Sequence, residues 1–391
     1  MKKLIALFTF LVVIFSLAAC DNGDNDASDN GDVDNDVVDN GEADNGEADD
    51  NGDDDNGVIE TDGGFVGVSM PSLALERWER DGNDIAGNLE AAGFDVDLQF
   101  AQDDVATQIS QIENMITAGV DILVVAPIDG ETLTGVLDLA NEQGIQVIAY
   151  DRLIMDSEHV SYYVTFDNFY VGVTQGNFLV DELGLGQGNG PFNIELFGGS
   201  PDDNNAHFFF DGAMSILQEH IDSGELYVVS DQTDFMQIGI LGWGTADAQD
   251  RMDALLSAYY TDTELHAVLS PNDSLALGIV TSLQNLGFGD TRPMPVVTGQ
   301  DGDLANVQSI LDGGQAMTVF KDTRVLATAA TNMVQEVLSG NPVTVTDTET
   351  YDNNVRVVPT YLAEVFVVTA DNVQELLVDS GFHSAEDLGL E

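Results

Sequence analysis

The sequence predicts an α/β protein with two doubly wound parallel-sheet domains. From about residue 64 onward, short β-rich runs alternate with segments of helical period. This alternation is typical of parallel sheets that are covered by helices on both faces. The same part of the chain is long for a single sheet of this kind, so we expect two α/β domains. The residues before it differ in composition and are expected to lie outside the fold.

A series of apolar, β-rich runs provides the expected strands. In chain order they are residues 64–70, 95–101, 121–127, 146–151, 192–199, 225–231, 266–273, 295–301 and 316–322. Helices are expected between them, and residues 105–119 illustrate the pattern. In that segment Val105, Ile109, Ile112 and Ile116 recur at steps close to the helical period of about 3.6 residues.

Residues 1–19 are predicted to be a lipoprotein signal peptide. Two lysines are followed by an apolar run from Leu4 to Ala18, which is short for a membrane span of about 20 residues. The run ends in "LAAC", and Cys20 is the only cysteine of the chain. A lone cysteine could be a catalytic nucleophile, but its place directly after a signal peptide favours lipidation. The expected location is therefore extracytoplasmic, with the membrane reached only through the lipid.

Residues 20–63 are predicted to form a disordered acidic tether. The segment repeats Asp-Asn-Gly units, contains no aromatic residue and has almost nothing to bury. Calcium binding is an alternative, because Asp32, Asp34 and Asp36 are spaced D-x-D-x-D. An EF-hand-like loop needs a glycine at the sixth position, where this chain has Val37, and a closing glutamate, which is missing. A solvated tether is the favoured interpretation, and no metal or other cofactor is expected.

The charge of the chain excludes one class of partner. Lys and Arg number 10 against 70 Asp and Glu, and the formal net charge is −60. Nucleic-acid binding requires a basic face, so no nucleic-acid partner is expected. Adaptation to high salt would explain the bias, because salt screens the self-repulsion of an acidic protein. Once the signal peptide is removed, the remaining cations are Arg77, Arg80, Arg152, Arg251, Arg292, Lys321, Arg324 and Arg356.

Polar residues gather where the expected strands end. In open α/β sheets, ligands bind beyond the carboxyl ends of the strands. The residues at these exits are Asp129, Asp151, Arg152, Ser200 to Asn205, Asn272, Asp273, Asp301 and Lys321. Some of these could simply be helix N-caps, and Asp273 and Asp322 are candidates for that role. Capping does not explain Arg152 or Lys321, because cations are disfavoured at helix N-termini.

Such a set of side chains suits a neutral polyol. Carboxylate and amide oxygens accept hydroxyl protons, whereas Arg and Lys donate to hydroxyl oxygens. An aromatic ring usually completes a sugar site by packing on the C–H face of the sugar. The chain has two tryptophans, Trp78 and Trp243, and the first is the better candidate because it follows Arg77. Phe166 and Phe208 are further candidates.

The stretches that carry these residues resemble the periplasmic sugar-binding proteins of ABC importers. The similarity is greatest to the D-xylose-binding proteins and the multiple-monosaccharide-binding receptors. The matching stretches are "ERWERDGN", "SQIENMITAGVDILVVAPIDG", "AYDRLI", "FDN", "FNIELFGGSPDDNNA", "LLSAYYTD", "VLSPND", "GQD" and "FKDTR". The resemblance as a whole extends from about residue 65 to the end of the chain. The acidic tether is not part of the usual family pattern.

The resemblance implies a hinged, two-lobed fold with three crossovers, which closes around one monosaccharide and then docks on a membrane permease. It places one lobe at residues 64–166 and 319–345, and the other at 167–318 and 346–391. It also implies the sugar contacts, which are Arg77, Trp78, Asp129, Asp151, Arg152, Asn205, Trp243, Asn272, Asp301 and Lys321, with Asn204 a weaker choice than Asn205. Lys321 would lie beside the hinge.

Three other functions remain as alternatives at this stage. An enzyme could use Asp151 and Asp301 as acid and base on a sugar. However, the chain has no nucleophile elbow, zinc-protease motif or phosphate-binding loop. None of its five histidines is at a strand exit. A sugar-responsive repressor would need a basic helix-turn-helix, which is missing. A sensor subunit would pass sugar occupancy to a chemoreceptor or a histidine kinase.

Overall fold

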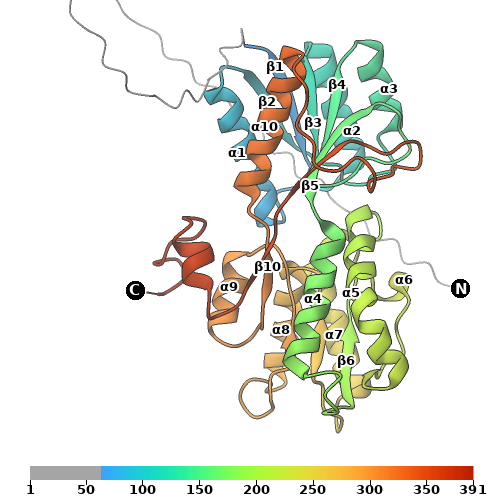
Figure 1. Cartoon of the computed structure of the whole chain (residues 1–391), viewed down its shortest axis with the longest axis vertical. Coiled ribbons are helices and arrows are strands. Elements are labelled where there is room, and N and C mark those ends of the chain that lie inside the picture. The colour runs from blue at the N-terminus through green and yellow to red at the C-terminus, as the bar shows by residue number, and fades with distance from the viewer. Residues whose placement is uncertain (1–62, 391) are drawn as a thin grey trace, which may run out of the picture. The chain divides into compact units, whose positions relative to one another are not determined.

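The computed structural model describes residues 63–390, and the predicted signal peptide, Cys20 and nearly all of the predicted tether lie outside them. The described chain builds two parallel sheets and one two-stranded antiparallel sheet, and we call each parallel sheet with its helices a lobe (Figure 1). Every predicted strand segment contains an observed strand, and the predicted helix at 105–119 is α2 (Val105–Ala118). The predicted α/β fold class is thus confirmed.

The first lobe contains a six-stranded, all-parallel sheet in the order β11-β5-β4-β3-β1-β2. Its strands are β1 (Phe65–Met70), β2 (Asp95–Phe100), β3 (Ile122–Val125), β4 (Gln146–Tyr150), β5 (Val160–Phe166) and β11 (Thr360–Ala363). Its helices are α1 (Glu76–Ala91), α2, α3 (Thr134–Glu142) and α10 (Thr323–Ser339). Apolar residues of α1 and α10 pack on one face of the sheet, and those of α2 and α3 pack on the other.

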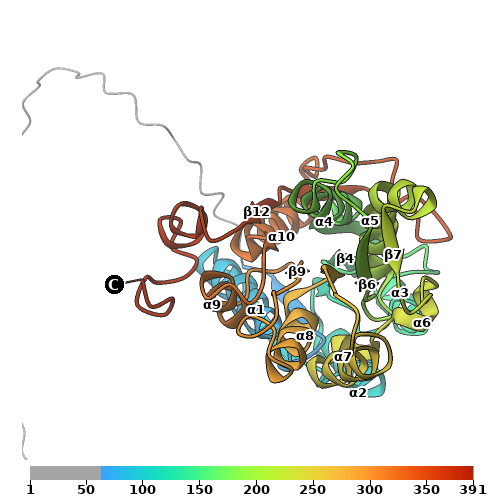
Figure 2. The same ribbon diagram turned by 90° about the horizontal axis from the view of Figure 1, so that it is seen from below.

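The second lobe contains a four-stranded parallel sheet in the order β7-β6-β8-β9. Its strands are β6 (Phe192–Leu196), β7 (Leu226–Val228), β8 (Ala267–Leu269) and β9 (Val296–Val297), and an antiparallel pair, β10 (Thr318–Phe320) and β12 (Phe366–Val368), lies beside them. The helices are α4 (Asn168–Leu183), α5 (Asn204–Ser223), α6 (Phe235–Ile238), α7 (Thr245–Tyr259), α8 (Asp273–Asn285) and α9 (Leu304–Leu311), with a short 3₁₀ helix at Leu241–Trp243 and a short π-helix at Gln374–Val378. Figure 2 shows α4 and α5 on one side of this sheet and α7 and α8 on the other.

The strand pairing corrects the predicted lobe boundaries in two places. β11 pairs in parallel with β5, so residues 360–363 belong to the first lobe rather than the second. β10 lies beside the residues that follow β9, through a parallel bridge between Gln300 and Val319, so it belongs to the second lobe. Both differences come from pairing between segments far apart in sequence, which local composition does not report. The chain passes between the lobes after β5, after β10 and between β11 and β12.

Candidate functional site

A cavity lies between the lobes, at the carboxyl ends of the strands. It encloses about 300 Å³ outside the atoms, part of which is open to solvent. The lining residues are Leu75, Arg77, Trp78, Asp151, Arg152, Asp203, Asn205, Phe209, Trp243, Asn272, Gln300, Asp301 and Lys321.

Arg77 is fixed by carboxylates at the start of α1. Its Nη2 donates to Asp81 Oδ2, one helical turn later, and to Asp151 Oδ2 at the end of β4, both at 2.8 Å. Its Nη1 lies 3.6 Å from Asp301 Oδ1 of the second lobe. Burial opposes the charge of Arg77, but Asp151, Asp81 and Asp301 outweigh it, so the pKa of the guanidinium lies above its ordinary value. The cation therefore stays charged in a buried position.

Asp151 has an unusual backbone conformation. Its φ is +59°, in the left-handed region that a non-glycine residue adopts at a cost. In this conformation its carbonyl accepts hydrogen bonds from Tyr163 Oη at 2.5 Å, Thr165 Oγ1 at 2.8 Å and Asn205 Nδ2 at 2.6 Å. The surrounding bonds thus hold the strained backbone, while the carboxylate faces Arg77.

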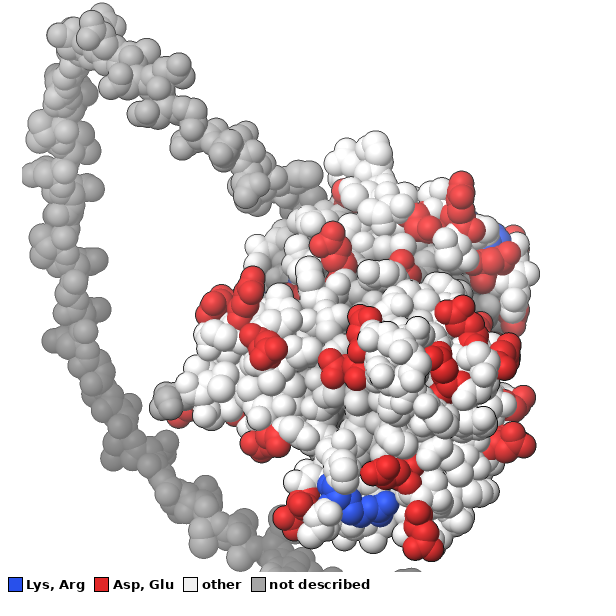
Figure 3. All heavy atoms as spheres, turned by 60° about the horizontal axis from the view of Figure 1, so that its bottom comes forward, with Lys and Arg blue, Asp and Glu red and all other residues white. Residues whose placement is uncertain are grey.

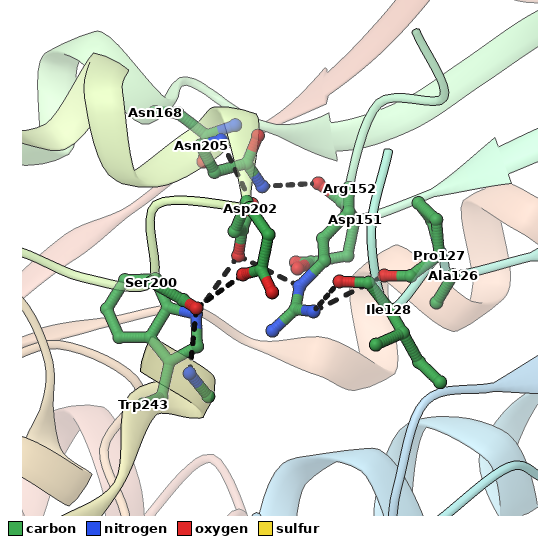
Figure 4. Close-up of polar contacts among 12 residues, drawn as sticks. Ala126, Pro127, Ile128, Asp151, Arg152, Asn168, Ser200, Asp202, Asn205 and Trp243 are labelled. Atoms are coloured by element: carbon green, nitrogen blue, oxygen red, sulfur yellow. Dashed lines mark hydrogen bonds and ion pairs between the residues drawn. The ribbon is translucent and has the colours of Figure 1, made fainter. Parts of the chain in front are cut away.

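Arg152 spans the cavity from the first lobe to the second (Figure 4). Its Nη1 donates to the carbonyl oxygens of Pro127, at 3.3 Å, and Ile128, at 3.1 Å. Its Nε lies 2.8 Å from Asp203 Oδ2, which is an ion-pair distance without hydrogen-bond alignment. The guanidinium carbon is also 5.2 Å from the centre of the Trp78 ring, and that of Arg77 is 4.5 Å away. The Trp78 indole therefore packs against both cations.

The second lobe supplies an indole and an amide. Trp243 Nε1 donates to Asp203 Oδ2 at 3.2 Å, and a Cβ atom at Gly199 would collide with the indole ring. The glycine of the "FGG" stretch therefore makes room for Trp243. Asn205, in the first turn of α5, donates to the Asp151 carbonyl and accepts from Tyr163 Oη at 3.1 Å. Its amide thus bonds directly to the other lobe.

Lys321 forms a buried ion pair with Asp301. Its Nζ lies 2.8 Å from Asp301 Oδ1, and 5.6 Å from the ring centres of both Phe166 and Phe209. Burial would raise the pKa of Asp301, but Lys321 and Arg77 hold it below the ordinary range. Asp301 therefore stays an anion, and it has a positive φ of +106°. Lys321 and Asp301 thus place a donor and an acceptor side by side at the cavity wall.

Comparison with known proteins identifies the family. A model described as "Periplasmic binding protein domain" matches residues 66–342. The chain belongs to the periplasmic binding protein family. This membership makes it a binding protein rather than an enzyme, and the predicted resemblance is confirmed.

Relatives of this periplasmic binding protein match nearly the whole described chain. The multiple sugar-binding periplasmic receptor ChvE of Rhizobium radiobacter is 54% identical over 328 residues, which cover 84% of this chain and 93% of that protein. The D-xylose-binding periplasmic protein of Escherichia coli is 36% identical over 323 residues, covering 83% and 92%. An ABC transporter solute binding protein from Clostridium phytofermentans, solved with bound β-D-glucose, has a TM-score of 0.81 and 49% identity, covering 83% of this chain and 99% of that chain.

One predicted site residue of this periplasmic binding protein does not line the cavity. Asp129 is half-buried, and its Oδ1 accepts a hydrogen bond from the Glu131 N–H at 2.8 Å. It was predicted because it follows a strand, but here it caps the turn after β3. The other predicted residues all line the cavity. The further aromatic candidates, Phe166 and Phe208, do not line the cavity. The Phe166 ring lies near Lys321 Nζ, and Phe208 packs against Tyr351.

Four lining residues of this periplasmic binding protein were not predicted as contacts: Leu75, Asp203, Phe209 and Gln300. Asp203 and Gln300 belong to the "DDNN" and "GQD" stretches, which the sequence analysis had placed at the site. The sequence alone does not indicate which of two neighbouring polar residues faces the cavity. Phe209 is adjacent to the predicted Phe208. Within residues 63–390, no helix is long and apolar enough to cross a membrane, and no group of three or more acidic, histidine or cysteine side chains could hold a metal ion.

Proposed function

We propose that this chain captures a monosaccharide between its lobes and delivers it to an ABC sugar permease. The observation that carries the proposal is the cavity wall, where Arg77, Arg152 and Lys321 are paired with buried carboxylates. A neutral polyol can accept from such cations and donate to such anions without adding charge to the site. The two indoles on the cavity wall, Trp78 and Trp243, also suit packing against the C–H face of a sugar ring.

The names of the relatives support the same ligand class. Solved relatives from Clostridium phytofermentans and Chloroflexus aurantiacus hold glucose, and the Escherichia coli relative is named for D-xylose. We propose an aldose of this kind as the ligand. Xylose lacks the hydroxymethyl group of glucose, so the volume available beside the sugar C5 position decides between them.

Calorimetric titration of the wild-type protein with D-glucose, D-xylose and related aldoses tests the proposal. We expect saturable binding of at least one sugar. Lys321→Met removes a charge-assisted donor and should weaken binding about 10- to 100-fold. Arg356→Met, which removes an exposed cation, is the matched control and should bind as the wild type does. The proposal would be wrong if no aldose bound the wild type.

A sensing role is a second candidate. The Rhizobium radiobacter relative is named a receptor. For this chain, the corresponding partner would be a chemoreceptor or sensor kinase that recognises the sugar-bound form. Sugar-dependent binding to the purified permease, but not to the sensor, would reject this candidate.

We also propose that the chain is tethered to the membrane by a lipid on Cys20 and that residues 20–63 act as its spacer. The support is the sequence pattern around Cys20. Labelled palmitate should enter the wild-type chain and fail to enter Cys20→Ser. Equal labelling of the two proteins would reject the anchor.

Finally, we propose that the protein is adapted to high salt. Figure 3 shows acidic residues spread over the surface and basic residues at few places. Arg356 is the one Lys or Arg among the described residues that is exposed, since the others are buried or half-buried. Because salt screens repulsion between surface carboxylates, the melting temperature should rise between about 0.1 and 1 M NaCl. A constant or falling melting temperature would reject the adaptation.

A further inference from the structure

Gln300 is a buried residue of the cavity wall whose side chain has no hydrogen-bond partner among residues 63–390. The residue is 1% exposed and lines the cavity. Its Oε1 is inaccessible to solvent and has no hydrogen-bond partner, and the side chain makes no hydrogen bond within the described part of the chain. Buried amides in folded proteins are nearly always hydrogen-bonded, so an unpaired one indicates a partner that the polypeptide itself does not supply.

The other polar side chains of the cavity wall differ from Gln300 in this respect. Apart from the Trp78 indole, every other polar side chain that lines the cavity already has a hydrogen bond or ion pair with protein groups. These side chains are Arg77, Trp243, Asp151, Arg152, Asp203, Asn205, Asn272, Asp301 and Lys321. Gln300 therefore differs from its neighbours in having its hydrogen-bonding capacity uncommitted.

The backbone fixes where Gln300 lies. Its carbonyl accepts a hydrogen bond from the Asp273 N–H at 2.9 Å, and the residue forms a parallel bridge with Val319 of β10. The next residue, Asp301, donates its N–H to the Val319 carbonyl at 2.9 Å. The side chain is thus held at the wall by its backbone, without help from bonds of its own.

We propose that Gln300 is a specificity-determining residue that binds one hydroxyl group of the ligand. An amide can accept a hydroxyl proton and donate to a hydroxyl oxygen, so it recognises a hydroxyl without adding charge. A ligand that lacks this hydroxyl leaves the amide buried and unpaired, and sites of this kind reject such analogues strongly. This inference rests on the proposed function, because it assumes a polyol ligand.

The test uses Gln300→Met and Gln300→Leu in the full chain, with the aldose that binds the wild type most tightly. Both variants fill a similar volume but cannot hydrogen-bond. We expect about 10- to 100-fold weaker binding by calorimetry, with an unchanged or higher melting temperature for the sugar-free protein.

The matched control is Gln108→Met. Gln108 is also fully buried, but its amide donates to Ser69 Oγ and the Ala126 carbonyl and accepts from the Ile128 N–H. Its loss should lower the melting temperature of the sugar-free protein. If the Gln300 variants lowered that temperature as much as Gln108→Met does, Gln300 would be structural and the proposal would be overturned.

Deoxy sugars identify the hydroxyl. One monodeoxy analogue should bind the wild type more weakly than the parent sugar does. The same analogue and the parent sugar should bind Gln300→Met equally tightly. Wild-type affinity of both Gln300 variants for the parent sugar would overturn the proposal while leaving the proposed function intact. Failure of the wild type to bind any aldose would overturn both.

Discussion

Asp303 has a buried carboxyl oxygen, and few nearby groups stabilise the negative charge of its ionised form. It follows the loop that carries Asp301, and its Oδ1 is inaccessible and has no hydrogen-bond partner among the described residues. Burial, together with the negative charges of Asp301 and Glu76, raises the pKa of Asp303 from 3.8 to about 7, although Arg80 and Arg77 oppose the shift. The folded protein thus holds this proton at a pH where the unfolded chain has lost it.

The consequence is a pH-dependent stability. Unfolding releases the Asp303 proton between about pH 4 and 7, so this group makes the folded state progressively less stable as the pH rises through that window. Above pH 7 the destabilisation of the folded state by Asp303 is constant, and below pH 4 it vanishes. Asp303→Asn should therefore unfold with a free energy about 1–3 kcal/mol higher than the wild type at pH 8 and similar to it at pH 4.

Urea titrations at several pH values measure this difference. Asp211→Asn removes an exposed carboxylate of α5 and serves as the control, with no comparable dependence expected. A stability difference between Asp303→Asn and the wild type that stayed constant from pH 4 to 8 would show that the carboxyl does not titrate as described.

Among the secondary-structure elements, α8 organises the second-lobe side of the site. Asp273, in its first turn, accepts hydrogen bonds at Oδ2 from the N–H groups of Gly302 and Asp303 and from Thr318 Oγ1, each at 3.0 Å. Its Oδ1 accepts from Gln315 Nε2 at 2.8 Å. One carboxylate thus joins α8, the loop that carries Asp301 and strand β10.

Removing this carboxylate should disturb stability and binding together. Asp273→Ala leaves buried donors unpaired and should lower the free energy of unfolding by about 2–4 kcal/mol. Because Asp301 loses the bonds that hold its loop, sugar affinity should fall as well. Asp104→Ala is the control, since Asp104 caps α2 through a single bond to Thr107 and lies outside the cavity. Wild-type affinity in Asp273→Ala would show that the loop holds Asp301 without help.

At this scale the sequence predicts more of the fold than of the lobe boundaries. Apolar runs reveal β1 and β3 because all or nearly all of their residues are buried, and polar residues after such runs indicate the ligand-binding edge. β11 pairs with β5 although nearly 200 residues separate them, as the pair Thr360 and Tyr163 illustrates. No local pattern reports such a pairing. In the same way, Asp129 and Asp151 both follow a strand, but only Asp151 lines the cavity. The difference depends on the path of the loop after each strand.

For the whole molecule, the two lobes bond to each other directly where they close over the cavity. Asn205 of the second lobe donates to the Asp151 carbonyl and accepts from Tyr163 Oη, both of the first lobe. Arg152 of the first lobe pairs with Asp203 of the second. These contacts contribute to the stability of the closed arrangement, and we expect them to favour closure before any ligand binds.

Asn205→Ala should therefore open the sugar-free protein. The substitution removes both hydrogen bonds, leaves the Tyr163 hydroxyl without its second contact, and adds no charge. The radius of gyration from small-angle X-ray scattering should rise relative to the wild type when no sugar is present, and saturating sugar should reduce the difference.

The neighbouring Asn204→Ala is the matched control, because Asn204 makes no hydrogen bond to the first lobe within the described residues. If Asn205 served only as a sugar contact, as the sequence resemblance implied, Asn205→Ala would weaken binding without changing the sugar-free radius. Since the measurement is made before any ligand is added, it separates closure from sugar recognition at the same residue.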